Sequence, residues 1–156
     1  MEHQTIFRLI SVNLTANFLL LSQLYQSGAV HPKATRLVVA SSLAAVTGYP
    51  SSAVYAATKA GLLHFAQSVA CTFKHCTVVL PGATDTPQAV QNTPDLRRRD
   101  KWMSAEAVAG IVIAKSLKTG ASLVVPGWRN TLLYWIATLF PSLVLSMMCR
   151  LFRAPE

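Results

Sequence analysis

The sequence is poor in charged residues, and acidic residues are the scarcest of them. Only 13% of the 156 residues are charged, with 6 Asp and Glu against 14 Lys and Arg, which gives a formal net charge of +8. Such an excess raises the question of an acidic partner. The chain has a single basic run, however, Asp95 to Lys101 (DLRRRDK), which acids interrupt and which has one neighbouring aromatic residue, Trp102. This pattern favours a solvated loop over a nucleic-acid surface.

Cysteine and glycine are also scarce in the patterns that build common binding sites. The three cysteines, Cys71, Cys76 and Cys149, match no zinc spacing and leave an odd number, so we expect reduced thiols and no metal site. The closest pair of glycines, Gly120 and Gly127, is seven residues apart. The chain therefore lacks the glycine-rich turn that holds the phosphates of a dinucleotide at a helix N-terminus.

A stretch near the C-terminus that lacks charge bears on location. Thr131 to Cys149 contains no charge and is flanked by Arg129, Arg150 and Arg153. A bilayer needs about twenty apolar residues, but Pro141 lies at the centre of this stretch. Aromatic residues and basic flanks also suit a helix that lies in the membrane interface. We favour packing on the domain or a subunit contact over membrane association, and both over spanning.

The N-terminus lacks a secretory pattern. It carries an acid at Glu2 and has no uninterrupted apolar stretch before a small-residue cleavage site. We therefore expect a cytoplasmic protein, with membrane association through the C-terminal segment as the alternative.

Helical and strand patterns alternate along the rest of the chain, whose hydrophobic content of 52% is enough for a core. The predicted elements are a helix over Ile6 to Tyr25, a strand over Thr35 to Ser42, a helix over Ser52 to Phe73, a strand over Cys76 to Gly82, a helix over Ser104 to Gly120 with Ser104 as its N-cap, and a strand over Ala121 to Gly127. This alternation is typical of a parallel sheet covered by helices. The sequence therefore predicts an α/β fold.

Polar side chains gather where the predicted strands end, and ligands of such sheets bind outside the carboxyl ends of the strands. The first strand ends in Ser41-Ser42, and the second is followed by PGATDTP, which supplies backbone N–H groups and threonine hydroxyls. Tyr55 and Lys59 lie just past the first strand end, and positions i and i+4 share a helix face. We expect hydroxyl, phenol and ammonium to converge on one cleft.

This combination of groups suits proton transfer to or from a substrate oxygen. A phenol has an unperturbed pKa of about 10, and a nearby ammonium lowers that pKa because it favours the phenolate. Tyr55 is then a candidate general acid or base, and Ser42 a donor to the same oxygen as charge develops on it. A single Tyr-x-x-x-Lys also occurs at the border of ordinary helices, so the pair alone does not decide the function.

The same segments carry a family resemblance. LVVASSLAAVTGYPSSAVYAATKAG, followed by VVLPGATDTP, resembles the short-chain dehydrogenase/reductase family, with a strand-end serine and a Tyr-x-x-x-Lys motif thirteen residues later. VNLTANFLLLSQ resembles the preceding family helix, and MSAEAVAGIV and LVVPG resemble the elements after the family's substrate loop. The resemblance runs from about Ile6 to Gly127 and rests on several motifs in order.

The resemblance implies hydride transfer between NAD or NADP and a small alcohol or carbonyl substrate. Tyr55 would be the catalytic acid or base, and Lys59 would lower its pKa and bind the nicotinamide ribose. Ser42 would hold the substrate oxygen, Asn13 would support a proton-relay water, and Ala89 to Trp102 would form the substrate loop. The nicotinamide end of the cofactor would meet Tyr55, Lys59, Pro81, Gly82, Ala83, Thr84 and Thr86.

The chain departs from the family in its cofactor-binding half. It starts where the family's fifth helix would start, so the resemblance implies a partial Rossmann-like doubly wound parallel sheet over residues 1–128, followed by an apolar and basic helical tail over 129–156. The first predicted strand then becomes an edge, which invites pairing. We expect one of three things: the sequence is truncated, another chain supplies the missing half, or the fragment is unstable. A homo-oligomer is also compatible with the exposed edge. The alternative is a non-enzymatic remnant that binds a partner or a membrane.

Overall fold

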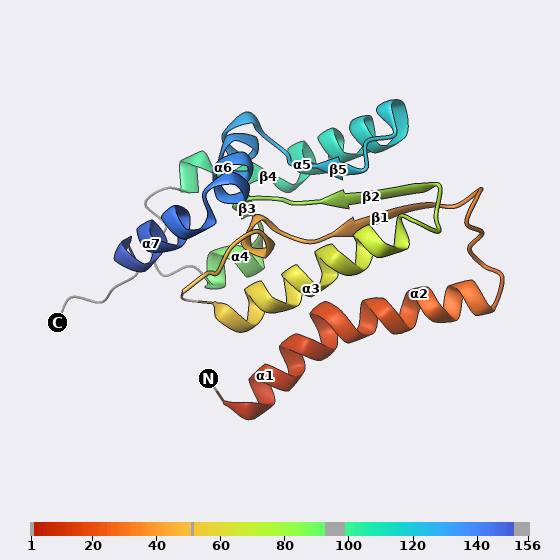
Figure 1. Ribbon diagram of the computed structural model, residues 1–156, viewed down its shortest axis with the longest axis horizontal. Helices are drawn as coiled ribbons and strands as arrows, with labels where there is room; N and C mark the ends of the chain where they lie inside the picture. The colour runs from red at the N-terminus through yellow and green to blue at the C-terminus, as the bar shows by residue number, and fades with distance from the viewer. Residues whose placement is uncertain (1, 51, 93–98, 152–156) are drawn as a thin grey trace.

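A parallel three-stranded sheet forms the centre of the protein (Figure 1). The computed structural model describes residues 2–50, 52–92 and 99–151. The strands are β1 (Arg36–Ala40), β2 (His75–Val79) and β5 (Leu123–Val124), in the order β1-β2-β5. Both pairs are parallel, with Ala40 opposite Val79 and Val79 opposite Val124. The structure confirms the predicted α/β class with a parallel sheet flanked by helices.

The central strand is buried because it has a neighbour on each side and helices against it. Val78 and Val79 in β2 and Leu80 just after it are at most 3% exposed. Thr77 is equally buried, and its hydroxyl donates a hydrogen bond to the carbonyl oxygen of Ala121 at 2.7 Å, which removes the cost of burying a polar group. β1 is an outer strand of this sheet, and Val38 on it is exposed.

Helix α3 (Ala53–Val69) connects β1 to β2 and packs on the sheet. Its buried residues Leu62, Leu63 and Ala66 recur at helical spacing, and Leu63 and Ala66 join Val78 and Leu80 in the core cluster. This helix carries the predicted catalytic pair, so the burial of its apolar face determines where that pair lies.

One continuous helical segment runs beside α3 (Figure 1). It consists of α1 (His3–Ile10), a π-helical turn η1 (Ser11–Thr15) and α2 (Ala16–Gln26). The rings of Phe18 and Phe65 lie with their centroids 4.3 Å apart. Closer to the turn, a Cβ on Gly61 would lie only 3.1 Å from a methyl carbon of Leu14. Gly61 therefore permits the close approach of η1 to α3.

The helix after the polar connection begins and ends as predicted. Ser104 is its N-cap, since its hydroxyl accepts the N–H of Ala107 at 3.1 Å. The helix comprises α5 (Ala105–Ile113) and a π-helical end η4 (Ala114–Thr119). Gly120 follows in the left-handed conformation with φ 64°, which costs glycine little.

Short elements that the sequence analysis did not predict surround the ends of the strands. β3 (Thr84–Asp85) and β4 (Met103–Ser104) form a separate parallel pair. The other three are the 3₁₀ turn η2 (Leu43–Ala45), helix α4 (Pro87–Asn92) and the 3₁₀ turn η3 (Arg99–Lys101). An ion pair of 2.9 Å between Arg99 and Asp85 links the two sides of the predicted substrate loop. Positions 93–98 of that loop lie outside the described residues.

The C-terminal segment forms two helices instead of one. α6 (Trp128–Leu139) and α7 (Pro141–Leu151) meet at an angle of 114°. Proline lacks an N–H group and restricts the residue before it to extended conformations, so the helix stops at Phe140. Ala137 is buried, Tyr134 packs against the core cluster, and a methyl carbon of Leu145 would lie 3.2 Å from a Cβ on Gly48. The predicted packing of this segment on the domain is thus observed.

Substitution of Gly61 tests the contact between η1 and α3. A leucine side chain at this position must displace Leu14, so we expect Gly61→Leu to lower the free energy of unfolding by about 1 to 3 kcal/mol. Gly110 in α5 is the matched control, because a Cβ there meets no atom within 4 Å. Gly110→Leu should leave stability unchanged or raise it slightly, since leucine favours helix more than glycine does. Equal effects in urea unfolding would contradict the close approach.

Substitution of Gly82 tests how α6 sits against the turn after β2. A Cβ on Gly82 would lie 2.7 Å from the side-chain Cγ of Asn130, below normal contact distance. We expect Gly82→Ala to cost about 1 to 3 kcal/mol of unfolding free energy, and less in an Asn130→Ala background. A double-mutant cycle by thermal unfolding measures this coupling. Strict additivity of the two substitutions would show that the residues do not touch.

Candidate active site

The predicted site residues lie at the carboxyl edge of the sheet. Ser42 follows β1, and the turn from Pro81 to Thr86 follows β2. Two backbone hydrogen bonds tie these strand ends together, from the N–H of Ser41 to the oxygen of Val79 at 2.9 Å and from the N–H of Leu43 to the oxygen of Pro81 at 3.0 Å. The structure therefore brings the serine and the Pro-Gly turn to one place, as the parallel order of the strands predicts.

Lys59 is anchored at the end of β1. Its ammonium donates a hydrogen bond to the carbonyl oxygen of Ala40 at 3.2 Å. The backbone carbonyl of Lys59 accepts a second bond of 2.7 Å from the hydroxyl of Ser41. Burial lowers the pKa of Lys59 below its ordinary value, because desolvation disfavours the charged form. The lysine thus joins helix α3 to the strand end with both its side chain and its main chain.

Tyr55 lies one helical turn before Lys59 on α3. The ammonium nitrogen of Lys59 is 5.8 Å from the centroid of the Tyr55 ring, a distance at which a cation and a ring face attract each other. Both side chains are half-buried. The predicted sharing of one helix face is therefore observed, and the strand end of β1 lies against the same lysine.

Ser42 adopts an extended backbone at the start of η2. Its φ and ψ are −164° and 158°, and its hydroxyl oxygen accepts the N–H of Ala44 at 3.2 Å. A serine hydroxyl that accepts one hydrogen bond still carries a proton to donate. The half-buried side chain can thus act as a donor while its oxygen is held in place by the 3₁₀ turn.

Asn13 lies in the π-helical turn η1, on the helical segment that packs beside α3. The main-chain carbonyl oxygen of Asn13 accepts a hydrogen bond of 3.1 Å from the side-chain amide of Asn17. The side chain of Asn13 is half-buried. π-Turns within α-helices are often found at functional sites. The structure places Asn13 next to α3 through the neighbouring contact of Leu14 with Gly61, whereas Ser42 and Lys59 are joined through the strand end.

The threonines after β2 take part in the turn itself. The hydroxyl of Thr84 donates to the carbonyl oxygen of Gly82 at 3.1 Å, and that of Thr86 accepts the N–H of Ala89 at 3.2 Å. The carbonyl oxygen of Ala83 accepts the N–H of Met103. Thr84 therefore directs its proton into the turn, while Thr86 keeps a proton that it can donate.

Two residues that support the site were missed by sequence reasoning. Ser41 was passed over for its neighbour Ser42, although it is buried and holds the carbonyl of Lys59. Asn130 lies against Gly82, and its amide donates to the carbonyl oxygen of Pro126 at 2.7 Å and lies 3.9 Å from the sulfur of Met103. The paired serines give a signal for the first. Asn130 has none, because its contacts come from distant segments.

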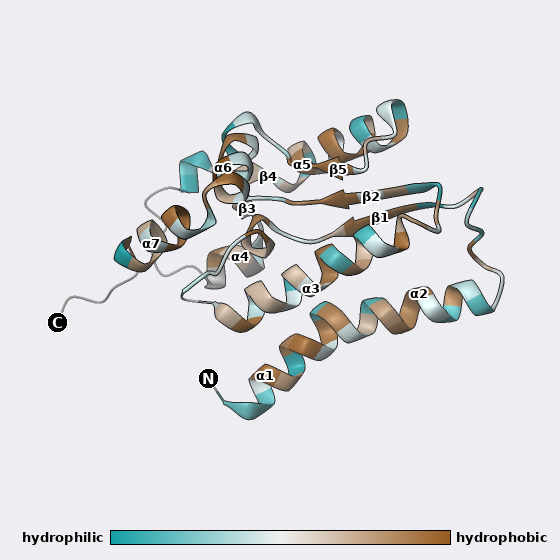
Figure 2. Ribbon diagram, in the orientation of Figure 1, coloured by the Kyte–Doolittle hydropathy of each residue, from teal (hydrophilic) through white to brown (hydrophobic). Residues whose placement is uncertain are grey.

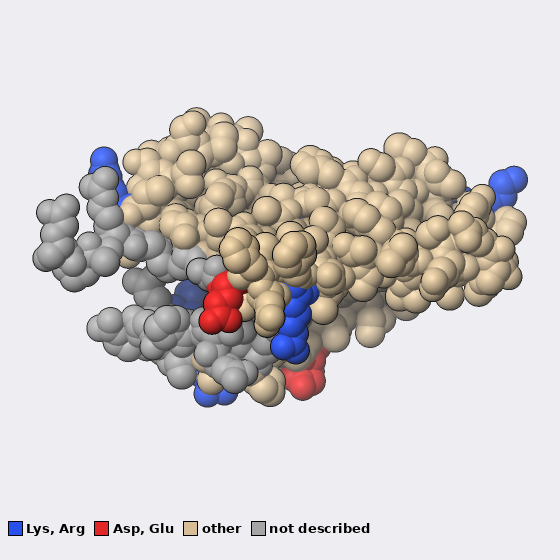
Figure 3. Space-filling view, turned by 90° about the horizontal axis from the view of Figure 1, so that it is seen from below, with Lys and Arg blue, Asp and Glu red and all other residues tan. Residues whose placement is uncertain are grey.

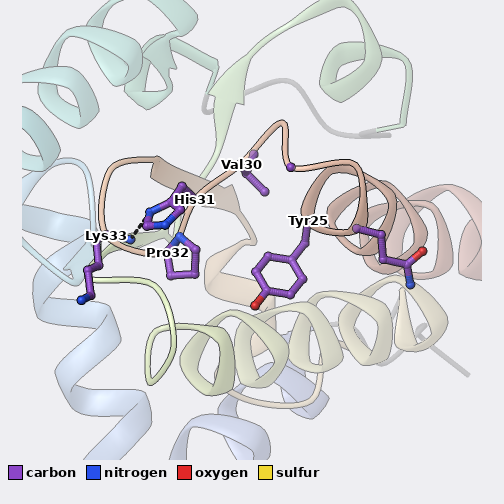
Figure 4. Close-up of a pocket in the computed structure, with 7 residues that line it drawn as sticks. Tyr25, Val30, His31, Pro32 and Lys33 are labelled. Atoms are coloured by element: carbon purple, nitrogen blue, oxygen red, sulfur yellow. Dashed lines mark hydrogen bonds between the residues drawn. The ribbon is translucent and has the colours of Figure 1, made fainter.

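A hollow in the described part of the chain lies away from this edge of the sheet (Figure 4). It measures about 580 Å³ and is lined by Tyr25, Gln26, Gly28, Val30, His31, Pro32 and Lys33. These residues precede β1, at the amino end of the strand, and the N–H of Lys33 donates to the Nδ1 atom of His31 at 3.3 Å. Ligands of parallel sheets bind at the opposite end, so we do not assign this hollow to the reaction.

No group of three or more His, Cys, Asp or Glu side chains that could hold a metal ion occurs among residues 2–50, 52–92 and 99–151. All three cysteines are free thiols, and burial raises the pKa of Cys76. The carboxyl edge of the sheet carries the phenol of Tyr55, the ammonium of Lys59 and the hydroxyl of Ser42.

Solved structures share this fold. The structure of a short-chain dehydrogenase from Sphingobium yanoikuyae in complex with NADPH matches with a TM-score of 0.65 at 19% identity, and covers 100% of this chain and 59% of that one. A structure of a 7beta-hydroxysteroid dehydrogenase matches with a TM-score of 0.73 at 20% identity, and covers 89% of this chain and 56% of that one.

Sequence comparisons extend the likeness from fold to family. An L-rhamnose-1-dehydrogenase from Scheffersomyces stipitis is 28% identical over 113 residues, which are 70% of this chain and 43% of that protein. The chain thus spans less than half the length of this relative. A model described as short chain dehydrogenase matches residues 1–97, which include Asn13, Ser42, Tyr55, Lys59 and the Pro81 to Thr86 turn. With well over half of its residues inside that match, the chain belongs to the short chain dehydrogenase family.

Proposed function

We propose that this chain contributes the catalytic residues of an oxidoreductase that transfers a hydride between NAD or NADP and the alcohol or carbonyl group of a small molecule. The observation that carries the proposal is the position of Lys59, which is bonded to the end of β1 and faces the ring of Tyr55. Family membership supports it, and so does the NADPH bound to the Sphingobium enzyme of the same fold.

The residues present fit the nicotinamide end of such a cofactor. An ammonium has three protons, and one of those on Lys59 is used by Ala40, which leaves two for the hydroxyls of a ribose. The turn from Pro81 to Thr86 lies at the same edge of the sheet and offers backbone groups and the Thr86 hydroxyl. When bound, the cofactor supplies the hydride chemistry, and the protein orients it.

Each catalytic role follows from chemistry that the residue can perform where it lies. Ser42 donates a hydrogen bond to the substrate oxygen, since its own oxygen is already held by Ala44. Tyr55 exchanges a proton with that oxygen as an alcohol becomes a carbonyl or the reverse. Lys59 favours the ionised phenol through its positive charge, and Asn13 holds a water that passes the proton onward.

The pyrophosphate end of the cofactor has no comparable site in this sequence. Backbone N–H groups of closely spaced glycines at a helix N-terminus usually bind it, and the closest glycines here are seven residues apart. We therefore propose that activity requires residues beyond these 156, supplied by the same polypeptide or by another chain.

Tyr55→Phe removes the hydroxyl that exchanges the proton. We expect turnover to fall by at least about 10² to 10⁴ fold while the far-UV circular dichroism spectrum and the melting temperature stay the same. The assay follows the absorbance of reduced nicotinamide in the active assembly with a panel of alcohols and ketones. Tyr25→Phe is the control, because Tyr25 lies near the C-terminal end of α2, away from the carboxyl edge of the sheet. This variant should keep full turnover. Retained turnover in Tyr55→Phe would remove this residue from its role.

Lys59 also gives the stability of the protein a pH dependence whose sign follows from its lowered pKa. Between that lowered pKa and the ordinary lysine value, the unfolded chain binds more protons than the folded chain does, so the free energy of unfolding rises with pH. The slope approaches at most about 1.4 kcal/mol per pH unit for one proton. Lys59→Met should abolish this rise in urea unfolding at alkaline pH. The exposed Lys74→Met variant is the control and should keep it. A rise that survives in Lys59→Met would assign it to other groups.

A further inference from the structure

Helices α6 and α7 use only one face each to pack on the domain. On α6 the inward residues Asn130, Tyr134 and Ala137 follow each other at spacings of four and three. On α7, which has no fully buried residue, the contact with the domain includes Leu145, which is 41% exposed and lies against Gly48. A helix that packs in this way normally presents polar side chains on its other face.

The outer face of α6 is apolar instead. Trp128, Leu132, Trp135 and Leu139 recur at spacings of four, three and four, which places them in one stripe. Their side chains are between 54% and 73% exposed. The ring of Trp128 also lies beside the guanidinium of Arg129, at 5.3 Å from its centroid.

The outer face of α7 continues the apolar surface. Leu143, Met147 and Leu151 recur every four residues and are between 54% and 75% exposed. Phe140, at the bend between the helices, is exposed as well. Brown, hydrophobic segments mark both arms of the bent pair in Figure 2. We call the outward residues of the two helices the α6–α7 surface.

The charged side chains on α6 and α7 have one sign. The two helices carry two basic residues, Arg129 and Arg150, and no acidic residue. Arg129 lies in the first turn of α6 and Arg150 in the last turn of α7. Tryptophan and arginine next to exposed leucines are typical of a protein surface in contact with lipid headgroups.

The lengths of the two helices exclude a simple span. Twelve residues of α6 extend about 18 Å, whereas the hydrocarbon core of a bilayer is about 30 Å thick. The two helices are long and apolar enough to cross a membrane only when they are taken together, and the bend of 114° between them keeps them from forming one rod. Two short helices with apolar outer stripes instead fit a position in the plane of the interface.

A second apolar surface, with few charged residues, lies on the side of the molecule where α1 and α2 run (Figure 3). The helix from His3 to Gln26 is long and apolar enough to cross a membrane, and Leu19 and Leu20 on it are exposed. It has no tryptophan, however, and the acid Glu2 lies next to its first residue. Leu19 on this helix therefore provides a control position for substitutions on the α6–α7 surface.

We propose that the α6–α7 surface docks the protein onto a lipid bilayer that contains anionic lipids, with both helices lying in the interface. The apolar stripes enter the boundary between headgroups and acyl chains, and Arg129 and Arg150 contact lipid phosphates. The positive net charge of the chain as a whole favours attraction to an anionic surface. This docking does not depend on the proposed catalytic role.

Vesicle sedimentation of the full chain tests the proposal. The probes are vesicles of phosphatidylcholine and of phosphatidylcholine mixed with phosphatidylglycerol, with a vesicle-free sample as the control for aggregation. We expect binding to the mixed vesicles and a weakening of about tenfold or more in Leu132→Glu/Leu139→Glu. The matched variant Leu19→Glu/Leu117→Glu changes two leucines that are equally exposed elsewhere and should bind normally. Circular dichroism confirms that both variants are folded.

Charge and depth provide two further readouts. Arg129→Gln and Arg150→Gln should each weaken binding to the mixed vesicles by about fivefold and leave binding to neutral vesicles unchanged. Brominated lipids should quench tryptophan fluorescence, and the quenching should disappear in Trp128→Phe/Trp135→Phe, where Trp102 alone remains.

Three results would overturn the proposal. The first is that the protein sediments with neither the neutral nor the mixed vesicles. The second is an equal loss of binding in the Leu19→Glu/Leu117→Glu variant, which would assign the binding to other surfaces. The third is a vesicle-independent change of oligomeric state in Leu132→Glu/Leu139→Glu by sedimentation velocity, which would show that a second copy of the chain covers this surface.

Discussion

The site depends on the junction between the end of β1 and the second turn of α3. The hydroxyl of Ser41 donates to the main-chain carbonyl of Lys59, and the side chain of Lys59 donates back to the carbonyl of Ala40. These two bonds fix both the position of the helix along the strand and its rotation about its own axis. Tyr55, one turn earlier, and Ser42, the next residue of the chain, take their places as a result.

The junction also explains which parts of the site could be predicted from sequence. Tyr55 and Lys59 share a face because the helix repeats every 3.6 residues, and Ser42 lies near them because parallel strands end at one edge. The three strands and the cap at Ser104 likewise follow from local pattern. The resemblance to a known family added the roles, which spacing alone does not give.

What could not be predicted depends on contacts between distant segments. The β3–β4 pair is two residues long on each side, too short to leave a periodic pattern. Asn130 reaches Gly82 across nearly fifty residues, and the close approach at Gly61 depends on Leu14. The apolar pattern of Thr131 to Cys149 showed that the segment was unusual, but the direction of the bend at Phe140 depends on how α6 and α7 pack.

The anchoring of the connection after β2 has a consequence for how such a protein can diverge. Its two sides are joined by the β3–β4 pair and by the ion pair of Asp85 with Arg99, and neither uses Ser42, Tyr55 or Lys59. Changing the length of a connection whose ends are already held together costs little free energy, about 0.6 kcal/mol for each doubling of a flexible loop. Natural selection can therefore rewrite the sequence between these anchors without disturbing the junction of β1 with α3.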